Sequence, residues 1–191
     1  MTPRTSGQLE KIREKRRRQI METGLELFAE LGYSSTSISR IAQKASISKG
    51  LMYNYFSSKE ELLVTIIDNG IGEMFKTFDP DKDGVLTAAE FEFFIGELFE
   101  LLSERRQFYR LYFTLMMQPD VWKLFEEKIS TVISTMLQLL SDYYNRKGVE
   151  KPEMEALLVG AVFDGVSFNY LLNPELFPLD DIKKLIIKKF V

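Results

Sequence analysis

Residues 34–59 read SSTSISRIAQKASISKGLMYNYFSSK, and this segment decides the fold. Ile38, Ile41, Ala42 and Ala45 recur at the spacing of one helical face, which predicts a short amphipathic helix. The hydroxyl of Thr36 stands just before this run, and we expect it to cap the helix by accepting a bond from a free backbone N–H. The segment therefore begins with a short helix that buries one side.

A second short helix is predicted after a break at residues 46–48, with Ser48 as its N-cap. Within residues 49–56, Met52 and Phe56 lie four positions apart and are expected to face inward together. Two short helices joined by three or four residues form a helix-turn-helix, whose second helix fits the major groove of duplex DNA. Asn and Lys side chains suit base edges, and Tyr and Ser hydroxyls suit phosphate oxygens. The pattern therefore predicts a protein that reads DNA.

The same stretch resembles the DNA-binding segment of TetR-family regulators. The resemblance is carried by ASISKGLMYNYFSSKEEL at residues 45–62 and by AELGY at residues 29–33. It covers about residues 13–63. Ser46 departs from the family pattern, which usually has Gly there. Because Gly eases a left-handed turn, the departure bears on the tilt of the second helix.

The resemblance implies that nine residues contact DNA. Those expected to face bases or the groove floor are Lys49, Gly50, Leu51 and Asn54. Those expected to face phosphates are Thr36, Ser37, Tyr53, Tyr55 and Lys59. Two alternatives stay open: Tyr55 packs against its own helix pair, or Leu51 fills a gap instead of meeting a thymine methyl group.

Charge is distributed unevenly along the chain. Residues 1–60 hold 11 Lys and Arg against 6 Asp and Glu, whereas residues 61–191 hold 14 against 22. A basic end is the electrostatic footprint of a DNA-binding domain. The densest basic cluster is Lys11, Arg13, Lys15, Arg16, Arg17 and Arg18. This cluster is either an arm that contacts the phosphates or the minor groove, or a solvated helical turn.

Composition excludes several classes of function. The chain has no Cys and no His, so disulfides, thiolate or imidazole metal sites and His-based catalytic triads are impossible. No nucleotide-binding loop or paired-carboxylate motif indicates an enzyme. No uninterrupted apolar run approaches about 18 residues, and the N-terminus lacks an apolar signal region, so we expect no membrane partner and a cytoplasmic location.

The whole chain is predicted to be all-α. A three-helix head with the helix-turn-helix is expected to precede a helical ligand-binding and dimerisation body. The predicted helices are 9–31, 37–45, 49–55, 59–77, 88–103, 105–117, 119–146, 151–172 and 179–190, separated by turn signals. We predict a helix-turn-helix DNA-binding domain at residues 1–60 and an effector-binding and dimerisation domain at residues 61–191.

Residues 79–90, DPDKDGVLTAAE, resemble an EF-hand calcium loop. The residues at its six ligand positions are Asp79, Asp81, Asp83, Val85 through its carbonyl, Thr87 and Glu90, and Gly84 stands at the sharp turn. Four clustered carboxylates repel one another unless a hard cation such as Ca²⁺ screens them. The alternative is a loop without a metal, because Thr87 and Glu90 also fit a capping box. EF-hands usually occur in pairs, and we find one.

The body after residue 90 is rich in aromatic residues and Met, most of which we expect in the core. The resemblance implies an apolar effector pocket, and we expect a small hydrophobic effector there. Its candidate lining is Tyr109, Tyr112, Phe113, Met116, Met117 and Trp122. Apolar faces in residues 129–140 and 157–168 predict a homodimer, which suits two half-sites of a palindromic operator.

These features predict a dimeric DNA-binding transcription regulator, usually a repressor by resemblance, that is controlled by an effector and also binds calcium through the loop. The alternative is a calcium-binding module or sensor whose helix-turn-helix-like head contacts another protein. Salt-dependent binding to duplex DNA distinguishes the two.

Overall fold

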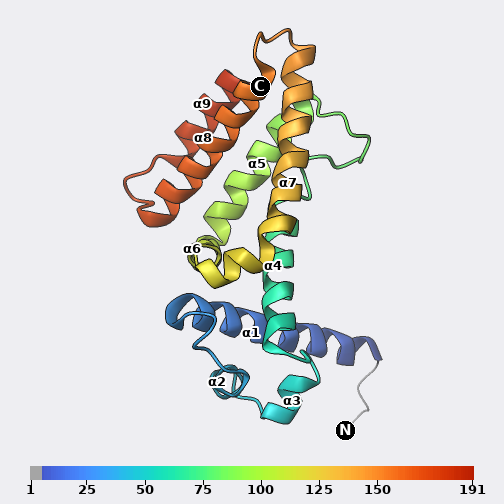
Figure 1. Ribbon diagram of the computed structural model, residues 1–191, viewed down its shortest axis with the longest axis vertical. Helices are drawn as coiled ribbons and strands as arrows, with labels where there is room; N and C mark the ends of the chain where they lie inside the picture. Colours follow the sequence, from blue (N-terminus) through green and yellow to red (C-terminus); the bar gives the residue numbers. More distant parts are fainter. Residues whose placement is uncertain (1–5) are drawn as a thin grey trace. The chain divides into compact units, whose positions relative to one another are not determined.

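Residues 6–191 are described by a computed structural model, and every regular element among them is an α-helix (Figure 1). In chain order the helices are α1 (Ser6–Leu31), α2 (Ile38–Lys44), α3 (Lys49–Tyr53), α4 (Lys59–Phe75), α5 (Ala88–Glu104), α6 (Arg106–Met116), α7 (Pro119–Arg146), α8 (Pro152–Leu172) and α9 (Leu179–Phe190). The predicted all-α fold, with a helix-turn-helix head followed by a helical body, is confirmed.

Some predicted helix ends differ from the structure. α1 begins at Ser6 instead of residue 9, which lengthens the helix at its N-terminal end. α3 ends at Tyr53 instead of residue 55, because Asn54 takes the C-cap position and its N–H bonds to the carbonyls of Leu51 and Met52. Helix ends are the least certain part of any sequence pattern, since they depend on one or two backbone bonds.

The chain divides into two compact units. The first comprises the residues up to Gly70 together with Leu111–Trp122, so it includes α1, α2, α3, most of α4 and the α6–α7 junction. Its fully buried apolar side chains come from all of these segments: Ile20, Phe28, Ile41, Met52, Phe56, Leu62, Ile66 and Leu115. The prediction that Met52 and Phe56 face inward is therefore confirmed.

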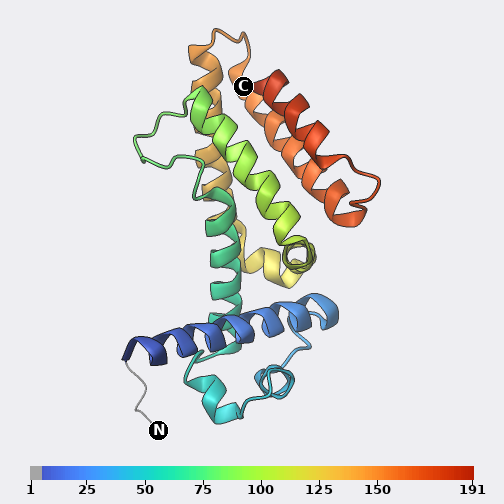
Figure 2. The same cartoon turned by 180° about the vertical axis from the view of Figure 1, so that it is seen from behind.

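The second unit comprises Ile71–Arg110 and Lys123–Val191, and aromatic rings fill its centre. Phe94 packs edge-to-face on Phe78, with ring centroids 4.7 Å apart, and on Phe163, at 6.0 Å. Phe91 packs on Tyr143 in the same way, at 5.6 Å. α5 also contacts α9 within this unit (Figure 2). Rings in such edge contacts bury large areas and add a specific attraction.

α8 is apolar around much of its circumference. One side is buried through Ala156, Val159, Phe163, Val166 and Leu171. The opposite side exposes a row of large apolar side chains, namely Met154, Leu157, Leu158, Phe168 and Leu172, each at least 49% exposed. Among the described helices, α8 alone has the length and apolarity of a membrane span, and 33% of its most apolar window is buried inside the structure. A core helix has the same composition, so this composition alone is weak support for a membrane span.

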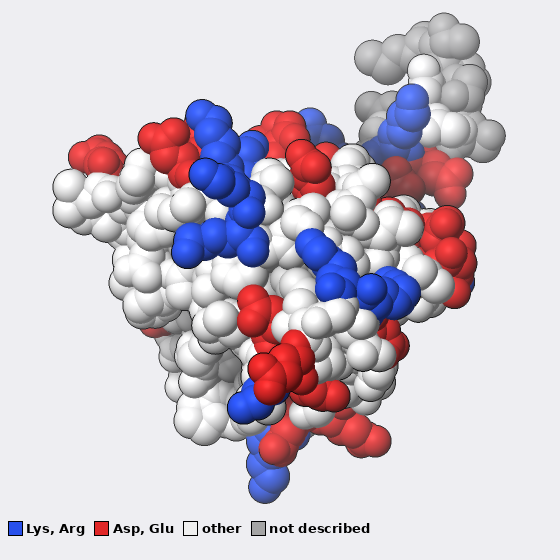
Figure 3. All heavy atoms as spheres, turned by 90° about the horizontal axis from the view of Figure 1, so that it is seen from above, with Lys and Arg blue, Asp and Glu red and all other residues white. Residues whose placement is uncertain are grey.

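Charged side chains of both signs lie near one another on the face seen in Figure 3, with broad uncharged areas between them. Neither the positive nor the negative side chains cover this face alone.

Candidate nucleic-acid interface

The turn that leads into α2 is held by two hydroxyls with different roles. Ser37 is the N-cap of α2, since its Oγ accepts a bond from the N–H of Arg40. The prediction that Thr36 caps this helix is wrong. Thr36 is 2% exposed, and its hydroxyl donates to the carbonyls of Gly32 (2.8 Å) and Leu27 (3.2 Å). Thr36 thus ties the turn to the end of α1, away from the surface.

The turn between α2 and α3 depends on Ser46 and Ser48. Ser46 has a φ of +55°, the left-handed region that Gly adopts with least strain. The chain then reverses, with the N–H of Ile47 bonding to the carbonyl of Ala42 at 3.0 Å. Ser48 caps α3 by accepting a bond from the N–H of Leu51 at 3.1 Å, as predicted. These local bonds set the angle at which α3 leaves the turn.

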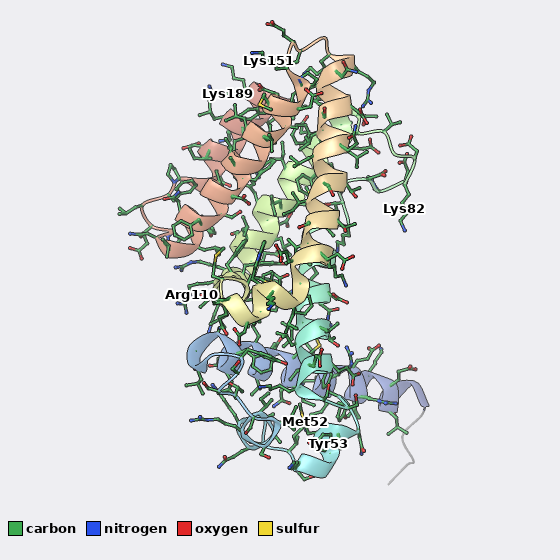
Figure 4. All side chains as sticks on the ribbon, in the orientation of Figure 1. Met52, Tyr53, Lys82, Arg110, Lys151 and Lys189 are labelled. Carbon is green, nitrogen blue, oxygen red and sulfur yellow. The ribbon has the colours of Figure 1, made fainter. Side chains whose placement is uncertain are left out.

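α3 has one buried side and one exposed side. Met52 is fully buried, whereas Tyr53 is 47% exposed, and Figure 4 labels both on this short helix. The exposed side carries five of the predicted DNA-contacting residues, namely Lys49, Gly50, Leu51, Tyr53 and Asn54. Tyr55 is half-buried. The structure thus exposes an ammonium, an amide, a phenol and an apolar side chain on this short helix, which are the groups that read base edges and phosphates.

Lys59 is engaged inside the first unit. Its ammonium donates to the carbonyls of Tyr33 (2.9 Å) and Ser34 (3.3 Å) and lies 4.3 Å from the centre of the Tyr33 ring. Burial, together with the negative charges of Glu60 and Asp120, raises the pKa of Tyr33 above its ordinary value. Lys59 therefore connects the start of α4 to the turn before α2.

Two side chains, those of Ser58 and Glu61, hold the start of α4 by hydrogen bonds. Ser58 Oγ accepts from the N–H of Glu61 at 2.9 Å, and the Glu61 carboxylate accepts from the hydroxyl and the N–H of Ser57. These bonds from Ser57 lower the pKa of Glu61, because they stabilise the charged form. These bonds hold the short loop between α3 and α4 in place, and this loop in turn fixes the position of α3.

Sequence reasoning missed two residues that support the interface. The side-chain amide of Gln118 donates to the carbonyl of Phe28 at 2.7 Å and accepts from the N–H of Tyr33 at 2.8 Å. Asp120 accepts a bond from the hydroxyl of Ser34 at 2.5 Å. These partners lie 85 to 90 residues apart in sequence, so no local pattern announces them. The α6–α7 junction thus holds the turn that precedes α2.

The loop predicted to bind calcium brings three of its carboxylates together. Ligand oxygens of Asp79, Asp81 and Asp83 all lie within 4.8 Å of one another. Asp79 Oδ2 accepts from the N–H of Gly84, while Asp79 Oδ1 is buried and has no hydrogen-bond partner. Lys82 stands on the same loop (Figure 4). The three aspartates present oxygen-only ligands of the kind that hard cations prefer.

Glu90 stands apart from these three aspartates in the structure. Its Oε2 accepts from the N–H and the hydroxyl of Thr87, both at 2.8 Å, and Thr87 Oγ1 accepts from the N–H of Glu90. This capping box lowers the pKa of Glu90. The loop is also tied to α7, since Arg146 donates to the carbonyl of the buried Leu86 at 2.7 Å. Arg146 therefore bonds the backbone at the position where a paired EF-hand would supply a strand.

The six residues predicted to line an effector pocket differ in exposure. Five belong to the first unit: Tyr112, Phe113 and Met116 are buried or half-buried, whereas Met117 is 75% and Trp122 is 42% exposed. Tyr112 donates to the carbonyl of Ile67 at 3.1 Å, and burial and the nearby charge of Asp68 raise its pKa. Tyr109, in the second unit, is fully buried and donates to Glu73 at 3.2 Å. The pocket stays a prediction.

An open hollow of about 420 Å³ lies elsewhere in the second unit. Its lining is Gly84, Ser134, Thr135, Gln138, Leu139 and Asp142. It therefore adjoins the aspartate loop and α7, and none of the six predicted pocket residues lines it.

The sequence profile of the family described as "Bacterial regulatory proteins, tetR family" matches residues 20–66. The uncharacterized HTH-type transcriptional regulator YuxN of Bacillus subtilis is 53% identical over 49 residues, which are 26% of this chain and 17% of that protein. The fatty acid metabolism regulator protein of the same organism is 31% identical over 86 residues, 44% of each chain. These matches thus span less than half the length of both relatives. The HTH-type transcriptional activator FasR of Mycolicibacterium smegmatis is 27% identical over 171 residues, 84% of this chain and 74% of FasR.

Solved structures share the fold over nearly the whole chain. A Clostridium perfringens putative fatty acid metabolism regulator has a TM-score of 0.73 at 21% identity, covering 90% of this chain and 96% of its own. FadR from Bacillus subtilis in complex with stearoyl-CoA has a TM-score of 0.69 at 19% identity, covering 91% and 97%. At such identity the likeness concerns the fold alone.

Proposed function

We propose that this chain, whose residues 20–66 match the sequence profile of the tetR family of bacterial regulatory proteins, is a dimeric transcription repressor that binds a palindromic operator under the control of a small hydrophobic effector. The observation that carries the proposal is the exposed side of α3. Its polar and apolar side chains stand on a helix that Met52 anchors from behind. A helix presented in this way fits the major groove, and a dimer places two such helices at symmetric half-sites.

Selection of bound sequences from a pool of random duplexes tests this proposal. We expect enrichment of a palindrome, and two substitutions on α3 divide the contacts by role. Tyr53→Phe removes a hydroxyl expected at phosphate, so it should weaken binding to all sequences similarly. Asn54→Ala removes an amide expected at a base edge, so it should relax preference at one position by about 1–3 kcal/mol. Recovery of no enriched sequence would overturn the proposal, and the opposite pattern for the two variants would overturn the roles.

The exposed row on α8 supports the dimer. A row of large apolar side chains at one face of a helix is typical of a surface that a partner covers. A second copy of this chain suits it, because the small residues Gly160, Ala161 and Gly165 lie along the same helix and allow close approach. α7 contributes Ile133, which is 45% exposed. A twofold contact through these helices would bring two DNA-binding heads into one particle.

Two observations support control by an effector. Arg106 Nε, in the second unit, is buried and has no hydrogen-bond partner. An unpaired buried donor is costly, and an acidic group on an otherwise apolar ligand would satisfy it. Stearoyl-CoA, which is bound in the solved structure of the structurally similar FadR, has both an acidic part and an apolar chain. In the first unit, Gln118 at the α6–α7 junction bonds to the turn before α2, so a shift of this junction would move the recognition helix.

A repressor acts where the chromosome lies, and we therefore place this protein in the cytoplasm. The curated relatives are described as transcriptional regulators. A regulator needs binding groups and no reaction chemistry, which agrees with a chain that has neither His nor Cys.

A second activity, calcium binding by residues 79–90, is favoured by the grouping of Asp79, Asp81 and Asp83 and by the unpartnered Asp79 Oδ1. Such a site would draw Glu90 from its capping box to supply both oxygens to the ion. The aspartate loop directly follows α4, the helix that leaves the DNA-binding unit. Calcium would accordingly stiffen the end of α4.

Glu90→Gln separates calcium binding from helix capping. Gln also completes a capping box, so stability in chelator should change little, while the charge needed for bidentate binding is lost. We expect Ca²⁺ to raise the melting temperature of the wild-type chain and to leave that of the variant unchanged, with Mg²⁺ at equal ionic strength as the control. Equal responses of the two chains, or none in either, would show that the loop binds no calcium through Glu90.

A further inference from the structure

Asp164 is the one charged residue within the exposed apolar row of α8. At about 100° per residue around the helix, every member of this row lies within about 60° of Ala161 on one side or the other. Asp164 is exposed, and it lies about 60° to one side of Ala161 and about 20° from Leu157. Glu155, the other charged residue in the stretch 154–172, lies about 120° to the other side, outside the row. A second copy that covers the row would therefore cover the Asp164 carboxyl as well.

Uncharged groups of α7 lie beside Asp164 in its own chain. A Cβ built at Gly160 would lie 4.0 Å from Cδ2 of Leu137, so these two positions mark where α7 and α8 meet. The two helices are consecutive and run antiparallel (Figure 1). Asp164, one turn beyond Gly160, therefore lies at the level of Ile133, one turn before Leu137. Ile133 and its neighbour Ser134 carry no charge, so α7 offers no cation at this level.

The other neighbours of α8 also leave Asp164 without a cation. α5 meets α8 through aromatic rings that pack on Phe163, about 100° around the helix from Asp164. Arg106 of α6 donates to the carbonyl of Leu171, which lies seven residues and about 10 Å along the helix from Asp164. Burial alone raises the pKa of Asp164, with no contribution from a charge on α5, α6, α7 or α9. Within the described chain, nothing therefore holds this carboxyl in its charged form.

Small residues mark the point at which two copies of α8 can come closest. Ala161 and Gly165 lie in the middle of the row, between large side chains toward both ends, and a Cβ built at Gly165 would meet nothing within 4 Å. Two packed helices that cross approach most closely at one point. In a twofold contact the axis passes through that point, because the same patch of each copy meets itself. Asp164 stands between these two small residues, so the two Asp164 carboxyls of a dimer would lie beside the axis and near each other.

We propose that the dimer formed through α8 takes up a proton from solvent between its two Asp164 carboxyls, so that acidification tightens the dimer. This inference rests on the dimer of the proposed function. Two carboxylates brought together in an apolar contact lose water and repel each other, and one shared proton removes one of the two charges. The dimer then binds more protons than two free chains do. Its extra stability is therefore fully present below the pKa of Asp164 in the free chain, and it is lost as the pH rises through the higher pKa of the pair.

The test measures the dimer dissociation constant of the full chain by sedimentation of a dilution series, between about pH 5 and about pH 8 at constant ionic strength. Asp164→Asn keeps the size and the hydrogen-bonding capacity of the side chain and removes its charge. Glu150→Gln is the matched control, because Glu150 is an exposed carboxylate in the loop before α8 and lies outside the row. Circular dichroism checks that both variants stay folded.

We expect the wild-type dissociation constant to rise about tenfold per pH unit in the window where the pair holds one proton and the free chains hold none. At about pH 8, the Asp164→Asn dimer should be at least about tenfold tighter than the wild-type dimer, and it should respond little to pH. Glu150→Gln should follow the wild-type chain. A full pH response in Asp164→Asn, or a dimer that this substitution weakens, would overturn the inference. A chain that stays monomeric at every pH would instead overturn the dimer itself, which belongs to the proposed function.

Discussion

Ser46 is the residue that sets the angle between α2 and α3. Its φ of +55° places a side chain in a backbone region where Gly has no steric cost. Ser48 caps α3 two residues later, so the turn has little freedom to relax. A small strain at this position is held in place by the bonds on either side, which is how strained residues persist in folded proteins.

Ser46→Gly should therefore stabilise the chain. Removal of the left-handed strain contributes about 1 kcal/mol, from which the greater freedom of Gly in the unfolded chain subtracts part, and a net gain of about 0.5 kcal/mol is expected. Urea denaturation measures it. Ser35→Gly is the control, because Ser35 has no positive φ, and it should destabilise slightly. A destabilised Ser46→Gly variant would show that the serine side chain, and not the backbone strain, matters here.

The position of α4 depends on Gly70, because the absence of a side chain there lets the Tyr112 ring approach the helix backbone. Gly70 is buried, and a Cβ built there would lie 2.2 Å from Cε2 of Tyr112. The Tyr112 hydroxyl also donates to the carbonyl of Ile67 on α4. The ring thus packs directly on the helix backbone, and its burial contributes to the first unit.

Gly70→Ala should displace this ring and cost about 3 kcal/mol, the upper range for overpacking. Gly72 lies two residues later on α4, and a Cβ there meets nothing within 4 Å. Gly72→Ala should consequently stabilise by about 0.5–1 kcal/mol through helix propensity alone. Thermal unfolding of the two variants gives the comparison, and equal melting temperatures would show that Tyr112 does not pack on α4 as described.

At the scale of the whole molecule, the exposed row on α8 has a direct consequence for assembly. Leu158 is 51% exposed in the middle of this row, and Leu124 on α7 is 52% exposed outside it. The same substitution at these two leucines therefore distinguishes a buried dimer contact from an ordinary surface position.

Leu158→Glu should yield monomers, because a carboxylate in an apolar contact is costly to desolvate. Operator affinity should fall by about 100-fold or more, since two linked heads bind far more tightly than one. Leu124→Glu should leave both properties unchanged. Analytical ultracentrifugation reports the oligomeric state. A dimeric Leu158→Glu variant would place the twofold contact on another surface.

Much of the DNA-binding head follows from local sequence. The apolar spacing predicts α2 and α3, Ser48 is the N-cap of α3, and Thr87 with Glu90 forms the capping box that the sequence also allows. Each of these features depends on groups within about four residues of one another. A helix and its cap therefore follow from the residue types and their order.

The tertiary structure alone decided the roles of Thr36 and Lys59, because Thr36 turns inward to the end of α1 and the bonds of Lys59 reach 25 and 26 residues back along the chain. Thr36 donates to carbonyls of α1 and the following glycine, and Lys59 closes onto the turn at Tyr33. The same holds for Gln118, whose partners lie 85 and 90 residues away. The sequence determined which side chains stand on each helix face, and long-range packing determined which of those faces stay exposed to a partner, since burial depends on neighbours that the chain brings together only when it folds.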